Sequence, residues 1–114
     1  MKKIDYTIVF VGDMKKAVEF YRDTLGLPLK FESPDWSEFA TETTTLALHK
    51  AGQTPAGSCH PGFVVDDVYE FHKAMQARGV RCIQPPKAEE FGGVLVTYAD
   101  PDGLPISVWS MTKK

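Results

Sequence analysis

The sequence predicts an α+β protein built from two βαβββ modules, whose curved mixed sheets surround a cleft. Two observations predict this fold. The order of one strand, one helix and three short strands occurs in each half of the chain. In addition, Tyr6 and Asp13 correspond to His60 and Asp67 at a constant offset of 54 positions. A four-stranded sheet with one helix on its back leaves its second face open, so two such sheets can enclose a cleft that neither forms alone.

The length and composition of the chain are those of one globular domain. Hydrophobic residues make up 43% and charged residues 25% of the 114 positions, which excludes a disordered chain. This length is enough for one hydrophobic core but too short for two independent ones. We therefore expect residues 1–114 to form a single domain, with a first module at about 2–52 and a second at about 58–111.

The first module begins with a strand and a helix. The run from Ile4 to Val11 is β-branched and aromatic, as in a strand that is buried on both faces. Asp13 can cap the following helix, and Gly26 can end it. The helix presents one apolar stripe at helical spacing, formed by Met14, Ala17, Val18, Tyr21 and Leu25. Three short strands are expected at 27–33, 36–41 and 44–50.

The second module repeats this order. A strand at 62–65 precedes Asp67, a helix cap with Glu70 three residues later, and Gly79 marks the helix end. His72 lies on this helix and is expected at the surface. Three strands follow at 80–84, 93–99 and 104–110, and the segment Asp100–Gly103 joins the last two as a tight turn.

Charge and motif content exclude several classes of function. Thirteen basic and fifteen acidic residues give a net charge of -2, which excludes a nucleic acid or an anionic membrane as a partner. The N-terminus has no signal-peptide cleavage site, so we expect a cytoplasmic protein. Cys59 and Cys82 have neither metal-site nor disulfide-scaffold spacing and are expected to be reduced thiols. The sequence contains no Ser-His-Asp order, phosphate-binding glycine loop or redox motif.

Three segments resemble a known family. Residues 11–29, 66–80 and 98–108 are similar to the first helix, the second helix and the closing hairpin of the glyoxalase/bleomycin resistance/dioxygenase (vicinal oxygen chelate) superfamily. The combination of FYRDTLG at 20–26 with DPDG at 100–103 is fairly specific for that fold. In metal-dependent members such as lactoylglutathione lyase, four ligands, usually His and Glu, hold a divalent cation that binds two vicinal substrate oxygens.

The resemblance places these four ligand positions on Tyr6, Ala47, His60 and Ser107. Only His60 is a good ligand for a divalent metal, although His49 would share a strand face with Ala47. A phenolate at Tyr6 is costly because the unperturbed pKa of tyrosine is about 10. We therefore expect no cofactor, and a divalent metal held by His60 and His49 is the alternative.

Strand alternation predicts an aromatic and apolar cavity with a few polar groups. Several of these residues have a structural alternative: Trp109 and Tyr6 as core, His60 as an exposed loop residue, and Trp36 as the cover of a strand edge. The segment around Glu90 is either a loop that closes over the cleft or a solvated turn. The expected ligand-binding residues are Tyr6, Ile8, Phe10, Trp36, His49, His60, Glu90, Ser107 and Trp109.

These observations lead to one main functional hypothesis and two alternatives. The main hypothesis is a metal-independent protein of the glyoxalase/bleomycin resistance type that binds a small organic ligand as a homodimer. The first alternative is a metal-dependent lyase or isomerase similar to lactoylglutathione lyase, or a dioxygenase. The second is metal-free catalysis with Tyr6, Glu89 or Glu90 as a general base. An aromatic cavity does not specify which molecule is bound.

Overall fold

The computed structural model describes residues 3–90 and 92–111. It divides into two compact units, one formed by residues 5–60 and the other by the residues from 61 onward together with Lys3 and Ile4. The predicted α+β class and the element order are confirmed. The elements are β1 (Lys3–Val11), α1 (Met14–Glu19), η1 (Phe20–Thr24), β2 (Leu29–Phe31), β3 (Trp36–Ala40), β4 (Thr45–Lys50), β5 (Cys59–Val64), α2 (Val68–Ala77), β6 (Cys82–Ala88), β7 (Gly93–Ala99) and β8 (Pro105–Met111).

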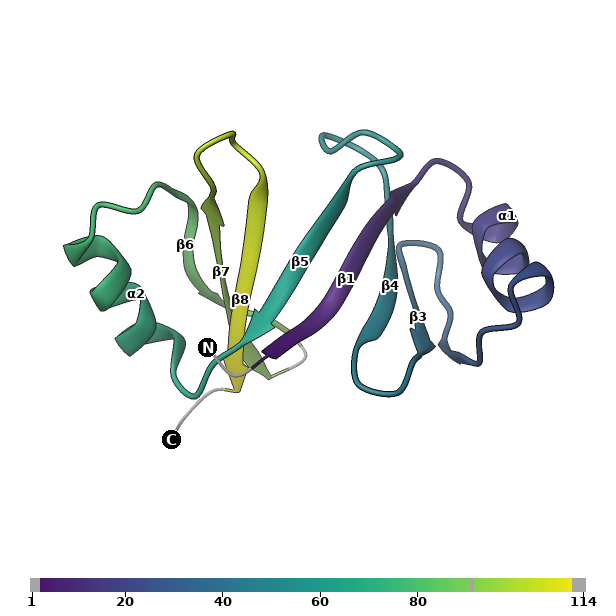
Figure 1. Ribbon diagram of the computed structural model, residues 1–114, viewed down its shortest axis with the longest axis horizontal. Coiled ribbons are helices and arrows are strands. Elements are labelled where there is room, and N and C mark those ends of the chain that lie inside the picture. Colours follow the sequence, from purple (N-terminus) through teal and green to yellow (C-terminus); the bar gives the residue numbers. More distant parts are fainter. Residues whose placement is uncertain (1–2, 91, 112–114) are drawn as a thin grey trace. The chain divides into compact units, whose positions relative to one another are not determined.

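The sheet of the first unit has the strand order β2-β3-β4-β1, of which Figure 1 labels β3, β4 and β1. β1 pairs with β4 in parallel, whereas β3 pairs with both β2 and β4 in an antiparallel manner. The sheet is therefore mixed, as predicted. Its parallel pair forms because the helix between the first and second strands returns the chain to the same end of the sheet.

Helix α1 covers one face of this sheet. Val18 on α1, Phe39 on β3 and Leu48 on β4 are at most 1% exposed and form the centre of the first core. Partly buried apolar residues from both layers surround them, namely Val9, Val11, Met14, Ala17, Tyr21, Leu27, Leu29 and Leu46. Alternate residues of β1, β3 and β4 thus point toward the helix, and the residues between them point to the opposite face.

The first helix differs from the prediction in its second half. α1 ends at Glu19 and continues as one turn of π-helix, in which the amide of Leu25 donates to the carbonyl of Phe20. The wider turn rotates the following residues, so Leu25 is 56% exposed and Leu27 packs on the core in its place. Placing Leu25 on the buried stripe was therefore wrong. Gly26 ends the helix at a positive φ of 80°, as predicted.

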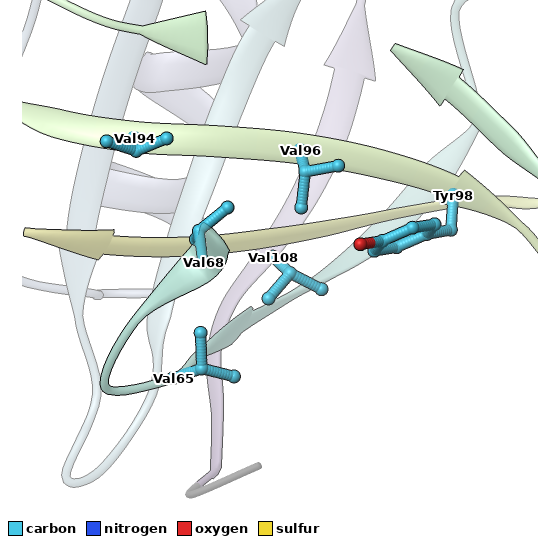
Figure 2. Packing of buried hydrophobic residues seen from close by; sticks show 6 residues of the cluster. All are labelled: Val65, Val68, Val94, Val96, Tyr98 and Val108. Carbon is cyan, nitrogen blue, oxygen red and sulfur yellow. The ribbon is translucent and has the colours of Figure 1, made fainter. Parts of the chain in front are cut away.

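The sheet of the second unit has the order β5-β8-β7-β6, with β5 parallel to β8. Its core contains side chains from α2, β7, β8 and the segment between β5 and α2, and Figure 2 shows six of them: Val65, Val68, Val94, Val96, Tyr98 and Val108. The buried hydroxyl of Ser110 accepts a hydrogen bond of 2.9 Å from the amide of Val68. This bond satisfies a donor of the first turn of α2 that has no partner within the helix.

The caps and turns of the second unit agree with those predicted from the sequence. Asp67 caps α2 by accepting from the amides of Tyr69 and Glu70, and the Asp100 carboxylate accepts from two amides of the turn before β8. His72 is not a simple surface residue. It is half-buried and lies 2.9 Å from the hydroxyl of Tyr98, whose pKa is raised by burial to about 12.

Strand β6 lies at one edge of its own four-stranded sheet and contains Pro85 and Pro86. Its pairing with β7 is irregular on both sides of Gln84.

Within residues 3–90 and 92–111, no helix is long and apolar enough to cross a lipid bilayer.

The π-helical turn can be tested by comparing the stability of a variant in the first core with that of a variant at Leu25. Leu48→Ala removes a fully buried side chain, so we expect the free energy of unfolding to fall by about 2–5 kcal/mol. Leu25→Ala should change it by less than about 0.5 kcal/mol, because Leu25 lies outside the core. Urea unfolding followed by circular dichroism measures both values. An equal loss in the two variants would indicate a regular helix that buries Leu25.

Candidate functional site

The face of the first sheet that points away from α1 carries most of the predicted ligand-binding residues. Phe10 on β1 lies opposite His49 on β4, and His49 in turn lies opposite Trp36 on β3. Glu38 and Ile8 both lie opposite Ala47 on the same face. We call the following set of side chains the ring face: Tyr6, Phe10, Trp36, Glu38, His49 and His60.

The five rings of the ring face form an unbroken series of contacts. The centroid of Trp36 lies 6.0 Å from that of Tyr6 and 5.8 Å from that of His49, and both contacts are edge-to-face. Phe10 then contacts His49 at 4.8 Å and His60 at 4.6 Å. Edge-to-face and tilted contacts of this kind are the favourable arrangements for aromatic pairs. The structure thus brings together Tyr6, Phe10, Trp36, His49 and His60.

Glu38 holds the indole of Trp36 in place. The Nε1 of Trp36 donates a hydrogen bond of 2.8 Å to Oε2 of Glu38, and the Nζ of Lys30 lies 3.8 Å from Oε1. The turn before β3 also fixes the backbone of Trp36, whose amide donates to the hydroxyl of Ser33. Glu38 is absent from the predicted set. Its position two residues after Trp36 on the same strand was the available signal, because alternate strand residues share a face.

The hydrogen bond of His49 determines which of its nitrogens carries a proton. Its Nδ1 lies 2.8 Å from the backbone carbonyl of Lys50. A carbonyl oxygen only accepts, so Nδ1 must donate. In the neutral ring the lone pair is therefore on Nε2, and the exposed His49 can accept a hydrogen bond from a ligand at that atom.

His60 and Tyr6 both keep their uncharged forms. His60 lies in β5 and is only 6% exposed, so its placement in an exposed loop is excluded. Burial, and secondarily the nearby His49, lower the pKa of His60. Burial also raises the pKa of Tyr6, with smaller effects from the charges of Glu38 and Asp5. The Tyr6 phenol therefore keeps its proton at neutral pH.

The remaining predicted site residues belong to the second unit. Ser107 and Trp109 are half-buried on the face of β8 opposite the valine core, where Ser107 pairs with Gly62 and Thr97. Glu90 is exposed in the turn between β6 and β7, which is closed by a hydrogen bond from the amide of Glu89 to the carbonyl of Gly93.

An open hollow of about 500 Å³ lies elsewhere on the first unit. It is lined by Met14, Lys15, Glu32, Ser33 and Pro34. None of these residues belongs to the ring face, and no aromatic side chain lines the hollow. Its chemistry therefore differs from that expected for an aromatic ligand.

Comparison with known proteins identifies the family. The family model of the Glyoxalase/Bleomycin resistance protein/Dioxygenase superfamily matches residues 3–108. The chain belongs to this superfamily. The resemblance found in the sequence is thereby confirmed.

The individual proteins to which this chain is similar are distant from it in sequence. The uncharacterized protein YraH from Bacillus subtilis (strain 168) is 26% identical in an alignment of 120 positions. The alignment covers 90% of this chain and 94% of YraH. A probable chloroplastic lactoylglutathione lyase from Arabidopsis thaliana is 26% identical over 90% of this chain but only 34% of its own length. A superfamily member from Vibrio splendidus 12B01 has a TM-score of 0.76 at 16% identity, over 92% of this chain and 96% of the other. The last comparison shows a common fold alone.

The four positions that the resemblance matches to metal ligands carry a phenol, a methyl group, an imidazole and a hydroxyl group. Ala47 is fully buried and has no donor atom, and the raised pKa of Tyr6 disfavours a phenolate ligand. Ser107 supplies a neutral hydroxyl in place of a carboxylate. In the part of the chain that the structure describes, no three His, Cys, Asp or Glu side chains lie close enough to share one ion. Of the four matching positions, His60 is the one whose side chain is a usual ligand of a divalent metal.

The lowered pKa of His60 predicts how stability depends on pH. Below pH 6.5 the unfolded chain binds a proton at His60 more readily than the folded chain. The contribution of His60 to the free energy of unfolding is therefore complete above pH 6.5 and is lost as the pH falls through the lower folded pKa. Urea midpoints measured across this range should fall with pH, and less steeply in His60→Gln.

Histidine titration by NMR provides the direct control. His49→Gln should raise the pKa of His60, because it removes the second of the two causes that lower it. If the pKa of His60 stays at its original value in this variant, the two imidazoles do not interact.

Proposed function

We propose that this protein binds a flat aromatic or apolar small molecule on the ring face, without a metal ion and without making or breaking a covalent bond. The observation that carries the proposal is the unbroken series of ring contacts from Tyr6 through Trp36 and His49 to Phe10 and His60. These rings lie on the sheet face that α1 does not cover. Rigid aromatic surfaces with a few oriented polar atoms are typical of sites for small organic molecules.

The polar atoms of the ring face support binding rather than catalysis. The Tyr6 hydroxyl can donate a hydrogen bond, and Nε2 of His49 can accept one. His60 is held neutral by burial, and Glu38 already accepts from Trp36. No pair of these groups forms the hydrogen bond between a nucleophile and a base, or between an acid and a base, that bond chemistry requires. Their arrangement suits a ligand that is oriented and kept intact.

Ligand binding to chelator-treated protein tests this proposal. A panel of aromatic antibiotics, catechols and glutathione conjugates should contain a compound that raises the melting temperature, because a ligand of the native state stabilises it by mass action. For that compound Trp36→Ala should weaken binding by about threefold to tenfold, since it removes one aromatic contact. Calorimetric titration measures the affinity.

Tyr69→Ala is the matched control. Tyr69 is an aromatic residue on α2 that is 57% exposed and lies outside the ring face, so its removal should leave the affinity unchanged. A panel that produces no shift in melting temperature contradicts the proposal, as does a ligand whose affinity is the same in Trp36→Ala.

The alternative function is a metal-dependent lyase or isomerase similar to lactoylglutathione lyase, or a dioxygenase. The named activity of the Arabidopsis relative favours it, and His60 and His49 both contact Phe10. Under this alternative the protein turns over a hemithioacetal or a catechol. That turnover would stop on addition of a chelator and in His60→Ala, and its detection would overturn metal-independent binding.

We also propose that the protein acts as a homodimer, because members of this superfamily commonly pair their sheets across a two-fold axis. Light scattering of the purified protein measures the molar mass and decides between a monomer and a dimer.

A further inference from the structure

The carboxylate of Glu38 is the one acidic group of the ring face. Glu38 lies opposite Ala47 in the middle of the sheet face, and its side chain is only 20% exposed. Its Oε2 accepts from the indole of Trp36, which turns the carboxylate toward the rings. A carboxylate at such a position repels an anionic ligand and attracts a cationic one, and partial burial strengthens both effects.

Lys30 neutralises Glu38 only weakly. The distance from Nζ of Lys30 to Oε1 of Glu38 is 3.8 Å, whereas the Arg22–Asp23 pair is at 2.8 Å. The Nζ of Lys30 also donates to the hydroxyl of Thr45 at 3.3 Å, and the Lys30 side chain is 47% exposed. An ion pair of this kind contributes little energy and is easily exchanged. A cationic group of a ligand can therefore replace Lys30 at Oε1.

Two aromatic rings stand next to this carboxylate at a steep angle to each other. The planes of Tyr6 and Trp36 are inclined by 64°, and their centroids are 6.0 Å apart. A negative ring face with a carboxylate beside it is an arrangement with which proteins hold an ammonium ion. The charge of Glu38 also contributes to the raised pKa of Tyr6, so its field extends to the Tyr6 hydroxyl.

We propose that the ring face selects ligands that carry a cationic amine beside a flat ring, with the ammonium group at Oε1 of Glu38 and against the rings of Trp36 and Tyr6. This inference rests on the proposed function and names the ligand class of the same site. Glu38 is then a residue that determines specificity, and the exposed Nε2 of His49 accepts a further hydrogen bond from the ligand.

Three probes that share one ring test the charge selectivity. They are 2-phenylethylamine, which is cationic, 2-phenylethanol, which is neutral, and 3-phenylpropionate, which is anionic. Affinities are measured at low ionic strength by the fluorescence of Trp36 in a Trp109→Phe protein, in which Trp36 is the only tryptophan. The amine should bind about fivefold to tenfold more tightly than the alcohol, and the carboxylate least tightly.

Glu38→Gln is the decisive variant because it removes the charge and retains an oxygen that can accept from Trp36. It should abolish the preference for the amine and leave the affinity for the alcohol within about twofold. Lys30→Met should increase the preference, since it removes the competing cation. Glu32→Gln is the matched control, because Glu32 is an exposed acid of the same unit that lies outside the ring face, and it should leave the preference unchanged. Circular dichroism checks that each variant is folded.

The possible outcomes separate this inference from the function on which it rests. Equal affinity for the amine and the alcohol, or a preference that persists in Glu38→Gln, overturns the charge selectivity and leaves aromatic binding intact. Tightest binding of 3-phenylpropionate also overturns it and would assign the polar contact to Lys30 or His49. If none of the probes nor any compound of the wider panel binds, both the function and the inference are overturned.

Discussion

The parallel pairing of β1 with β4 is the constraint on which the rest of the first unit depends. Its register places Phe10 opposite His49 and Val9 opposite Leu48. One set of alternate residues then packs under α1, and the other set forms the ring face. A shift of the register by one residue would exchange the two sets, exposing the core and burying the imidazole of His49. The burial of Leu48 and Phe39 therefore also holds the functional side chains in position.

Most of the fold could be predicted because it depends on short-range patterns. Capping by Asp13 and Asp67, the glycines that end both helices, and the turn at Asp100 are local signals, and all are present in the structure. The π-helical turn has no such signal. The sequence from Phe20 to Thr24 is compatible with a regular helix, and only packing shows that Leu27 rather than Leu25 contacts the core.

The placement of side chains on the ring face could be predicted where alternation along one strand determines it, and less well where tertiary contacts do. Tyr6, Phe10 and His49 follow from alternation alone. His60 is adjacent to Pro61, which suggests a loop, yet both residues lie in β5 and pairing with β8 begins at Gly62, one residue after the proline. Glu38 was missed because the partner of a charged strand residue, here the indole of Trp36, depends on side-chain geometry.

The two prolines of β6 affect how copies of the chain can associate. A proline has no amide hydrogen, so Pro85 and Pro86 interrupt the row of donors that an edge strand offers to an incoming strand. The irregular pairing with β7 further distorts this edge. Continuous sheet extension from one molecule to the next is therefore disfavoured at β6. A contact between two copies at this edge would therefore use side chains rather than backbone pairing.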